Sequence, residues 1–119
     1  MKFLWCTIYV KDLDASLRFY KEIVGLPVTR RFSEPGAELA FLGDGDTKLE
    51  IIQGKGEPHS GVGVSIGFLV DNLEEKMTFV NGHGIPVHSG PFAPSARTRF
   101  FFVSDPDGVL VQFVEQKQA

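Results

Sequence analysis

The chain has 119 residues, 43% of them hydrophobic and 12% aromatic, so its length fits one domain with enough apolar side chains for a core. Twelve basic and 15 acidic residues give a net charge of -3 without a long run of either sign, which argues against nucleic acid or a membrane surface as a partner. Cys6 is the only cysteine, which excludes an intrachain disulfide and a cysteine metal cluster and is typical of a cytoplasmic protein.

The first half of the chain predicts a strand, a helix and three further strands. Residues 3–10 are apolar, aromatic or β-branched, as strands prefer, and Asp12 is placed to cap the helix that follows. Apolar side chains then recur at helical spacing from Leu13 to Val24, and Gly25 supplies the stop. The opening segment is too short for a membrane span and lacks a small-residue cleavage site. The three further strands are expected at 27–33, 37–43 and 48–53.

The second half predicts the same order of elements. A strand is expected at 62–70, followed by a helix that Asn72 caps and Gly82 ends. Asp105 opens the sequence SDPDG, which is typical of a type I turn between the last two strands. The segment 54–61 is rich in turn-forming residues and is the expected linker. The remaining strands are expected at 85–89, 98–104 and 109–115.

An internal repeat connects the two halves. Matching residues recur at a nearly constant offset. Val10, Leu13 and Phe19 match Val70, Leu73 and Phe79, each 60 residues later, and Phe41, Asp44 and Asp46 match Phe102, Asp105 and Asp107 at an offset of 61. The repeat predicts an α+β fold of two βαβββ modules, at about 1–53 and 62–119, within a single domain.

Two stretches of the chain resemble the vicinal oxygen chelate superfamily, which includes glyoxalase I, extradiol dioxygenases and the bleomycin resistance proteins. They are VKDLDASLRFYKEIVGLPV, from Val10 to Val28, and FFVSDPDGVLVQFVE, from Phe101 to Glu115. The second is the more specific. The resemblance implies a glyoxalase-like fold, in which mixed, mostly antiparallel sheets form a cleft, usually within a homodimer.

The resemblance also implies where a metal would bind. Metal-using relatives take their ligands from the first and last strand of each module. In this sequence those positions are Trp5, Glu50, Ser65 and Gln112. An indole cannot ligate a metal, and one carboxylate with one carboxamide falls short of the three or four groups that a zinc, nickel or iron site takes. We therefore expect no metal and no other cofactor.

Several of these side chains are candidates for ligand binding. Glu50, inside the apolar run KLEIIQ, is expected either as a general base or ligand anchor in the cleft, or as a group in a solvated groove. Trp5 either stacks on a planar ligand or fills the vacated metal pocket. Tyr9 shares its strand face and either offers a hydroxyl to the cleft or is a core residue. Ser65 and Gln112 complete the predicted cleft lining.

Charged groups elsewhere in the chain add one candidate. Arg99 lies at the start of a predicted strand, where it either holds a ligand's carboxylate or phosphate or is solvated. None of the three histidines falls at a ligand position. His59 lies in the linker, His83 near the end of the second helix, and His88 at a strand end that some arrangements bring to the rim of the cleft.

The first functional hypothesis is a metal-free small-molecule binding protein of the bleomycin-resistance type. The run Phe100 to Val103 makes both strand faces apolar, which favours a planar or apolar ligand. The alternative is a glyoxalase-, lyase- or dioxygenase-like enzyme, with a non-standard metal site from Glu50, Gln112 and His88, or with Glu50 as a metal-free base. A third possibility is a vestigial cleft in a protein that acts through dimerisation or a partner.

Overall fold

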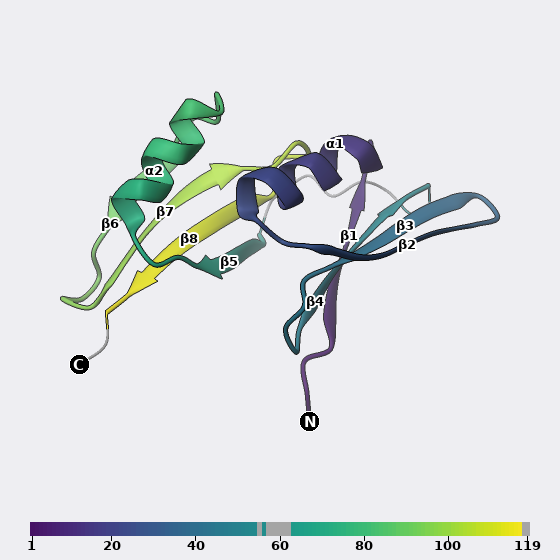
Figure 1. Cartoon of the computed structure of the whole chain (residues 1–119), viewed down its shortest axis with the longest axis horizontal. Coiled ribbons are helices and arrows are strands. Elements are labelled where there is room, and N and C mark those ends of the chain that lie inside the picture. Colours follow the sequence, from purple (N-terminus) through teal and green to yellow (C-terminus); the bar gives the residue numbers. More distant parts are fainter. Residues whose placement is uncertain (55, 57–62, 118–119) are drawn as a thin grey trace. The chain divides into compact units, whose positions relative to one another are not determined.

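The computed structural model describes residues 1–54, 56 and 63–117, which form two compact units, Met1–Ser60 and Gly61–Ala119 (Figure 1). Each unit contains a four-stranded sheet, with the order β1-β4-β3-β2 in the first and β5-β8-β7-β6 in the second. In both sheets the first two strands of this order are parallel and the other neighbours are antiparallel. The predicted α+β fold of two βαβββ modules is confirmed.

Apart from the sixth strand, the elements lie close to the predicted ranges in both units. The first unit contains β1 (Trp5–Val10), α1 (Leu13–Arg18), the π-helix η1 (Phe19–Val24), β2 (Val28–Glu34), β3 (Ala37–Leu42) and β4 (Lys48–Gln53). The second contains β5 (Ser65–Leu69), α2 (Leu73–Gly82), β6 (Ser89–Phe92), β7 (Thr98–Ser104) and β8 (Leu110–Gln116). The helices of the described residues are α1, η1 and α2, and none of them is long and apolar enough to span a membrane.

The helices begin and end where the sequence signals predict. The Asp12 carboxylate accepts a hydrogen bond from the Ala15 N–H at 3.1 Å, and Asn72 Oδ1 accepts one from the Glu75 N–H at 3.0 Å. Gly25 follows η1 with φ of 95°, a conformation that glycine adopts without steric cost. The first helix differs from the prediction in one respect, since its second half is a π-helix.

The prediction for the sixth strand was wrong. It placed the strand at 85–89, whereas β6 spans Ser89–Phe92. The Ile85 N–H donates to the Val80 carbonyl at 2.9 Å, so this residue still belongs to the helix exit, and Pro86 has no N–H to donate. Pairing with β7 therefore begins only near His88, whose N–H donates to the Phe102 carbonyl at 2.7 Å.

Each sheet has one face covered by the helices of its own unit, and most of the core lies there, apart from a smaller buried cluster on the other face of the first sheet. In the first unit Leu13 and Tyr20 are buried with Ile51, and in the second Leu73 is buried with Phe113. Because side chains alternate along a strand, the neighbouring positions lie on the opposite face, which we call the open face of the sheet. The predicted site residues Trp5 and Glu50 belong to this open face in the first unit.

Candidate functional site

The open face of the first sheet brings two predicted site residues onto adjacent strands. β1 and β4 run parallel, with Thr7 beside Glu50 and Trp5 beside Lys48. The Thr7 hydroxyl donates to Glu50 Oε1 at 2.6 Å, and both side chains are half-buried. This bond explains how a carboxylate fits inside an apolar strand. Glu50 has a hydrogen-bonding partner and access to solvent, so it avoids the cost of a buried unpaired charge.

Trp5 lies near the start of β1 with 48% of its surface exposed. Its indole packs edge to face against the Phe41 ring, with the two centroids 5.6 Å apart and the planes at 78°. Trp5 and Phe41 line an open hollow of about 450 Å³, together with Leu4. Within its own unit, therefore, the indole is one wall of a hollow that is wide enough to receive a ligand.

The rim of this hollow is polar. It contains Thr29 and Arg30 from β2, Lys48 from β4, and Asp46 from the turn before β4. The Thr29 hydroxyl donates to the Phe41 carbonyl at 3.2 Å, which ties β2 to β3 behind the hollow. The sequence pattern predicted Trp5 but none of these polar groups. Tyr9 and Glu50 lie on the same sheet face but do not line the hollow.

Tyr9 is positioned at the other end of β1, where its ring faces the chain that leaves β4. A Cβ atom at Gly56 would lie 3.3 Å from the Tyr9 ring, so the ring and this backbone are in close contact. The remainder of the predicted linker, apart from Gly54, lies outside the described residues, as does His59. The structure therefore separates Tyr9 from the hollow that Trp5 lines.

In the second unit the strands pair in the same register as in the first, but the side chains at the corresponding positions differ. Gly67 lies beside Gln112, as Thr7 lies beside Glu50 in the first unit. A Cβ atom at Gly67 would lie 3.2 Å from Gln112 Oε1, so the missing side chain leaves room for the carboxamide. Ser65 is exposed two residues earlier on the same strand face. This face offers neutral hydrogen-bonding groups where the first unit offers a carboxylate.

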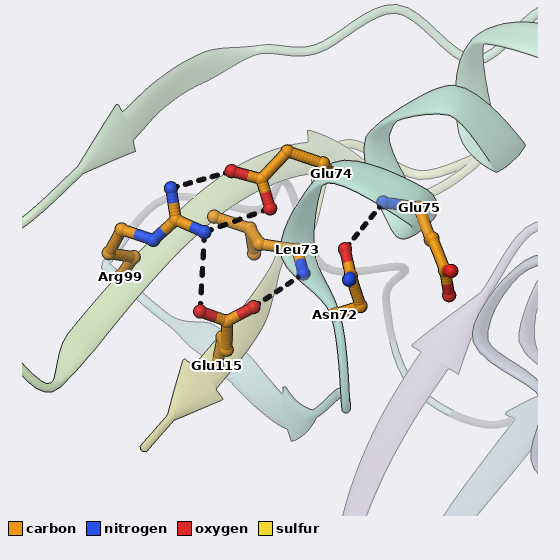
Figure 2. Close-up of polar contacts among 6 residues, drawn as sticks. All are labelled: Asn72, Leu73, Glu74, Glu75, Arg99 and Glu115. Carbon is orange, nitrogen blue, oxygen red and sulfur yellow. Dashed lines mark hydrogen bonds and ion pairs between the residues drawn. The ribbon is translucent and has the colours of Figure 1, made fainter.

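Arg99 lies on the opposite face of its sheet from Gln112, toward α2. Figure 2 shows its guanidinium between two carboxylates, with Glu74 at 2.7 Å and Glu115 at 3.2 Å. Arg99 is thus engaged in joining α2 to the sheet and is not brought together with Ser65 and Gln112. On β7 the buried residues Phe101 and Val103 show that the odd-numbered side chains face the helix, but the sequence carried no signal of this because the run from Phe100 to Val103 is apolar on both faces.

These contacts set the protonation of the carboxyl groups. The Leu73 N–H donates to Glu115 Oε2 at 2.9 Å, and this bond together with Arg99 holds the pKa of the Glu115 carboxyl below its usual value although burial opposes it. The Arg99 guanidinium likewise lowers the pKa of Glu74. The same two carboxylates raise the pKa of Arg99, so all three groups are charged at neutral pH.

The residues at the four metal-ligand positions do not fit a metal. Trp5 has no lone pair to donate, and Glu50 contributes the only ionisable oxygens of the set. Elsewhere in the described part of the chain, no group of three or more His, Cys, Asp or Glu side chains is arranged to hold one. The His88 ring is engaged locally, with Nδ1 3.1 Å from the Ser89 hydroxyl.

Comparisons with known proteins agree with this architecture. The model of the Glyoxalase/Bleomycin resistance protein/Dioxygenase superfamily matches residues 2–113. A probable lactoylglutathione lyase of Vibrio parahaemolyticus is 29% identical, over 99% of this chain and 93% of its own length. The structure of Leishmania major glyoxalase I superimposes with a TM-score of 0.82 at 28% identity, over 97% of this chain and 86% of that one.

The same fold occurs in a protein with a binding role. TnmS3, an antibiotic binding protein from Streptomyces sp. CB03234, superimposes with a TM-score of 0.83 at 18% identity, over 98% of this chain and 97% of that one. This likeness concerns the fold alone. The family model, the relatives and the four-stranded sheet in each unit agree. The chain therefore belongs to the glyoxalase, bleomycin resistance and dioxygenase superfamily, also known as the vicinal oxygen chelate superfamily.

Proposed function

We propose that this protein binds a small planar or apolar molecule on the open face of its first sheet and does so without a metal. The observation that carries the proposal is the half-exposed Trp5 indole at the wall of a hollow of about 450 Å³. Ligand sites in proteins have volumes of roughly 300–1,000 Å³ and are lined mainly by apolar and aromatic groups. Trp5, Phe41 and Leu4 supply such a lining.

The contact between the two rings supports stacking on Trp5. The edge-to-face packing on Phe41 holds the indole in place, so a ligand ring meets a preorganised surface. A tryptophan side chain has only two rotatable bonds, and fixing it costs little conformational entropy. A flat ligand would therefore gain contact area on the exposed half of the indole at a small entropic cost.

The chemistry of the ligand positions favours binding over metal-assisted catalysis. Curated relatives of this chain are named lactoylglutathione lyases. Here, however, an indole stands at position 5 and a hydroxymethyl group at position 65, and neither supplies the donors of a divalent metal site. The indole at position 5 instead leaves an aromatic surface available to an organic ligand.

A second candidate function rests on Glu50. Its Oε1 is held by the Thr7 hydroxyl at 2.6 Å, which orients the carboxylate on the open face. An oriented carboxylate in reach of solvent is able to abstract a proton from a bound substrate, as metal-free lyases or isomerases require. Replacement of Glu50 by glutamine tests this candidate, since any measured turnover that survives the substitution removes Glu50 from the mechanism.

The experiment for the first candidate uses the single tryptophan as the reporter. Because Trp5 is the only tryptophan, energy transfer from it to the neutral dye N-phenyl-1-naphthylamine reports binding beside position 5. We expect saturable transfer in the native protein and, by the fluorescence of the directly excited dye, weaker dye binding in Trp5→Leu. Phe92→Leu is the matched control, since Phe92 is similarly exposed, at 45%, in the second unit. Equal dye binding by Trp5→Leu and the native chain would contradict the proposal.

The expected assembly and location remain part of this proposal. The resemblance of the sequence to the superfamily implies a homodimer, and the single cysteine is typical of a cytoplasmic protein. Sedimentation equilibrium of the full chain measures the assembly state directly. A monomer at micromolar concentration would contradict the expected homodimer and leave the dye experiment above unaffected.

A further inference from the structure

We propose that the ligand of the hollow carries an acidic group, such as a carboxylate, sulfonate or phosphate, which Arg30 and Lys48 bind beside the Trp5 indole. This inference rests on the proposed binding function and specifies the class of its ligand. It is drawn from residues of the first unit alone, since the described residues that line the hollow all lie between Leu4 and Lys48.

Strand pairing places each cation next to an aromatic wall of the hollow. Lys48 on β4 is the register partner of Trp5 on β1, and Arg30 on β2 is the partner of Phe41 on β3. Side chains of directly paired residues lie on the same face of a sheet, so the two cations flank the two rings. A ligand whose ring lies on Trp5 therefore has positive charge within reach on either side.

Both cations are held in place by neutral contacts. The Arg30 guanidinium lies over the Phe32 ring, with its Cζ 4.6 Å from the ring centroid, and Lys48 Nζ donates to the Gly45 carbonyl. Among the described residues, no carboxylate forms an ion pair with either of them. Arginine offers five donors and lysine three, so most of their hydrogen-bonding capacity is available to a ligand.

The described side chains at the rim of the hollow carry a net positive charge. Among the described residues that line the hollow, Asp46 is the only carboxylate and stands against two cations, which leaves one net positive charge. An anionic group near an arginine fork forms charge-assisted hydrogen bonds, which are about twice as strong as neutral ones. Arg31, the next residue, provides a contrast. It pairs with Asp14 at 2.9 Å on the helix side and has no part in the hollow.

The test compares two dyes that differ in one sulfonate, 8-anilinonaphthalene-1-sulfonate and the neutral N-phenyl-1-naphthylamine. Energy transfer from Trp5 shows that each dye binds at the hollow. We expect the sulfonate to bind the native protein about tenfold more tightly than the neutral dye, since hydrogen bonds to charged groups are worth at least this much. Added salt should weaken the binding of the sulfonate dye and leave the affinity of the neutral dye unchanged.

Three variants assign the preference to the rim. Arg30→Gln combined with Lys48→Gln should abolish the preference for the sulfonate while the neutral dye still binds. Arg31→Gln, which removes one positive charge from the opposite face, should keep the preference. Asp46→Asn should increase it about threefold, because it removes the repulsive charge from the rim. Circular dichroism of each variant verifies that the fold is retained.

The outcomes separate this inference from the function on which it rests. Equal affinity for the two dyes, or a preference that survives loss of both Arg30 and Lys48, would overturn the acidic-ligand inference while the binding function stands. Absence of energy transfer from Trp5 to either dye would overturn the binding function and this inference together. A preference lost in the double variant and kept in Arg31→Gln supports both.

Discussion

The backbone N–H of Leu73 donates to the Glu115 carboxylate at 2.9 Å and so joins the first residue of α2 to the last strand of its sheet (Figure 2). The first unit contains the same contact in a different chemical form, where the Leu13 N–H donates to Gln53 Oε1 at 2.7 Å. The first N–H groups of a helix have no partner within the helix. In both units, therefore, the last strand supplies a hydrogen-bond acceptor for the first N–H of the helix, and the internal repeat includes this contact.

The Gln53 contact leads to a first prediction. Gln53→Met removes the acceptor but keeps the length of the side chain, so the Leu13 N–H loses its partner at a half-buried position. We expect the free energy of unfolding to fall by about 1–2 kcal/mol. Gln53→Glu is the control, because a carboxylate keeps the acceptor and suits the start of a helix.

Urea unfolding followed by fluorescence measures this effect in the appropriate unit, since Trp5 is the only tryptophan and lies in the first sheet. A Gln53→Met protein as stable as the native chain would show that solvent replaces the lost acceptor without cost. A Gln53→Glu protein as unstable as Gln53→Met would show that the amide itself is required.

The Glu115 contact leads to a second prediction, on the dependence of stability on pH. The Leu73 N–H and Arg99 lower the folded-state pKa of Glu115 below its unfolded value. A depressed pKa contributes stability that is fully present above the unfolded pKa, about 4.3 for glutamate, and is lost as the pH falls through the folded value. Glu115→Gln should therefore be less stable at neutral pH and should lose less stability in acid.

Thermal unfolding at a series of pH values, followed by circular dichroism, measures this difference. The melting temperatures of the native protein and Glu115→Gln should converge as the pH falls below the unfolded pKa of about 4.3 and through the lower folded pKa, because protonated Glu115 has no charge to offer Arg99. Two parallel curves, separated by the same interval in acid and at neutral pH, would contradict the assigned role of the charge.

The donor set at the four ligand positions leads to a third prediction. After dialysis of the native protein against zinc, nickel, iron and manganese in turn, elemental analysis should find each metal well below one per chain, because the set contains a single ionisable side chain, Glu50. Near-stoichiometric metal that is lost in Glu50→Ala would contradict this expectation. It would indicate a site assembled from unexpected ligands, and lyase and dioxygenase assays would follow.

The local order of the chain could be predicted because each signal acts over a few residues. Asp12, Asn72 and Gly25 set helix ends by contacts with near neighbours, and the structure contains those contacts. The range of β6 could not be predicted in this way. The Ile85 N–H is bonded to the Val80 carbonyl five residues earlier, so Ile85 belongs to the helix exit, and the pattern of apolar residues after the helix does not show where this exit ends.

The rim of the hollow was missed for a related reason. Arg30 and Lys48 come from β2 and β4, and they meet around Phe41 only because the strands pair in one register. A sequence shows which strands are amphipathic but not which residues of two strands lie opposite each other. The ion pairs of Arg99 could not be predicted for the same reason, since its partners Glu74 and Glu115 lie on other elements.

The last prediction concerns Gly54, which follows β4 with φ of 103°. A Cβ atom there would collide with the Gly36 carbonyl oxygen of the β2–β3 turn and lie 3.3 Å from the Ala37 Cα. Both neighbours are backbone atoms, which cannot move aside as a flexible side chain can. Gly54→Ala should therefore lower the free energy of unfolding by about 1–3 kcal/mol through combined backbone strain and steric conflict.

Gly45→Ala is the matched control for this substitution. Gly45 lies in the turn before β4, its φ is outside the left-handed region, and a Cβ atom there would meet nothing within 4 Å. We expect its unfolding free energy to stay within about 0.5 kcal/mol of the native value. Urea unfolding measured through Trp5 compares the two variants directly. Equal stability of both would mean that the chain after β4 shifts freely, and that Gly54 does not fix the contact with the β2–β3 turn.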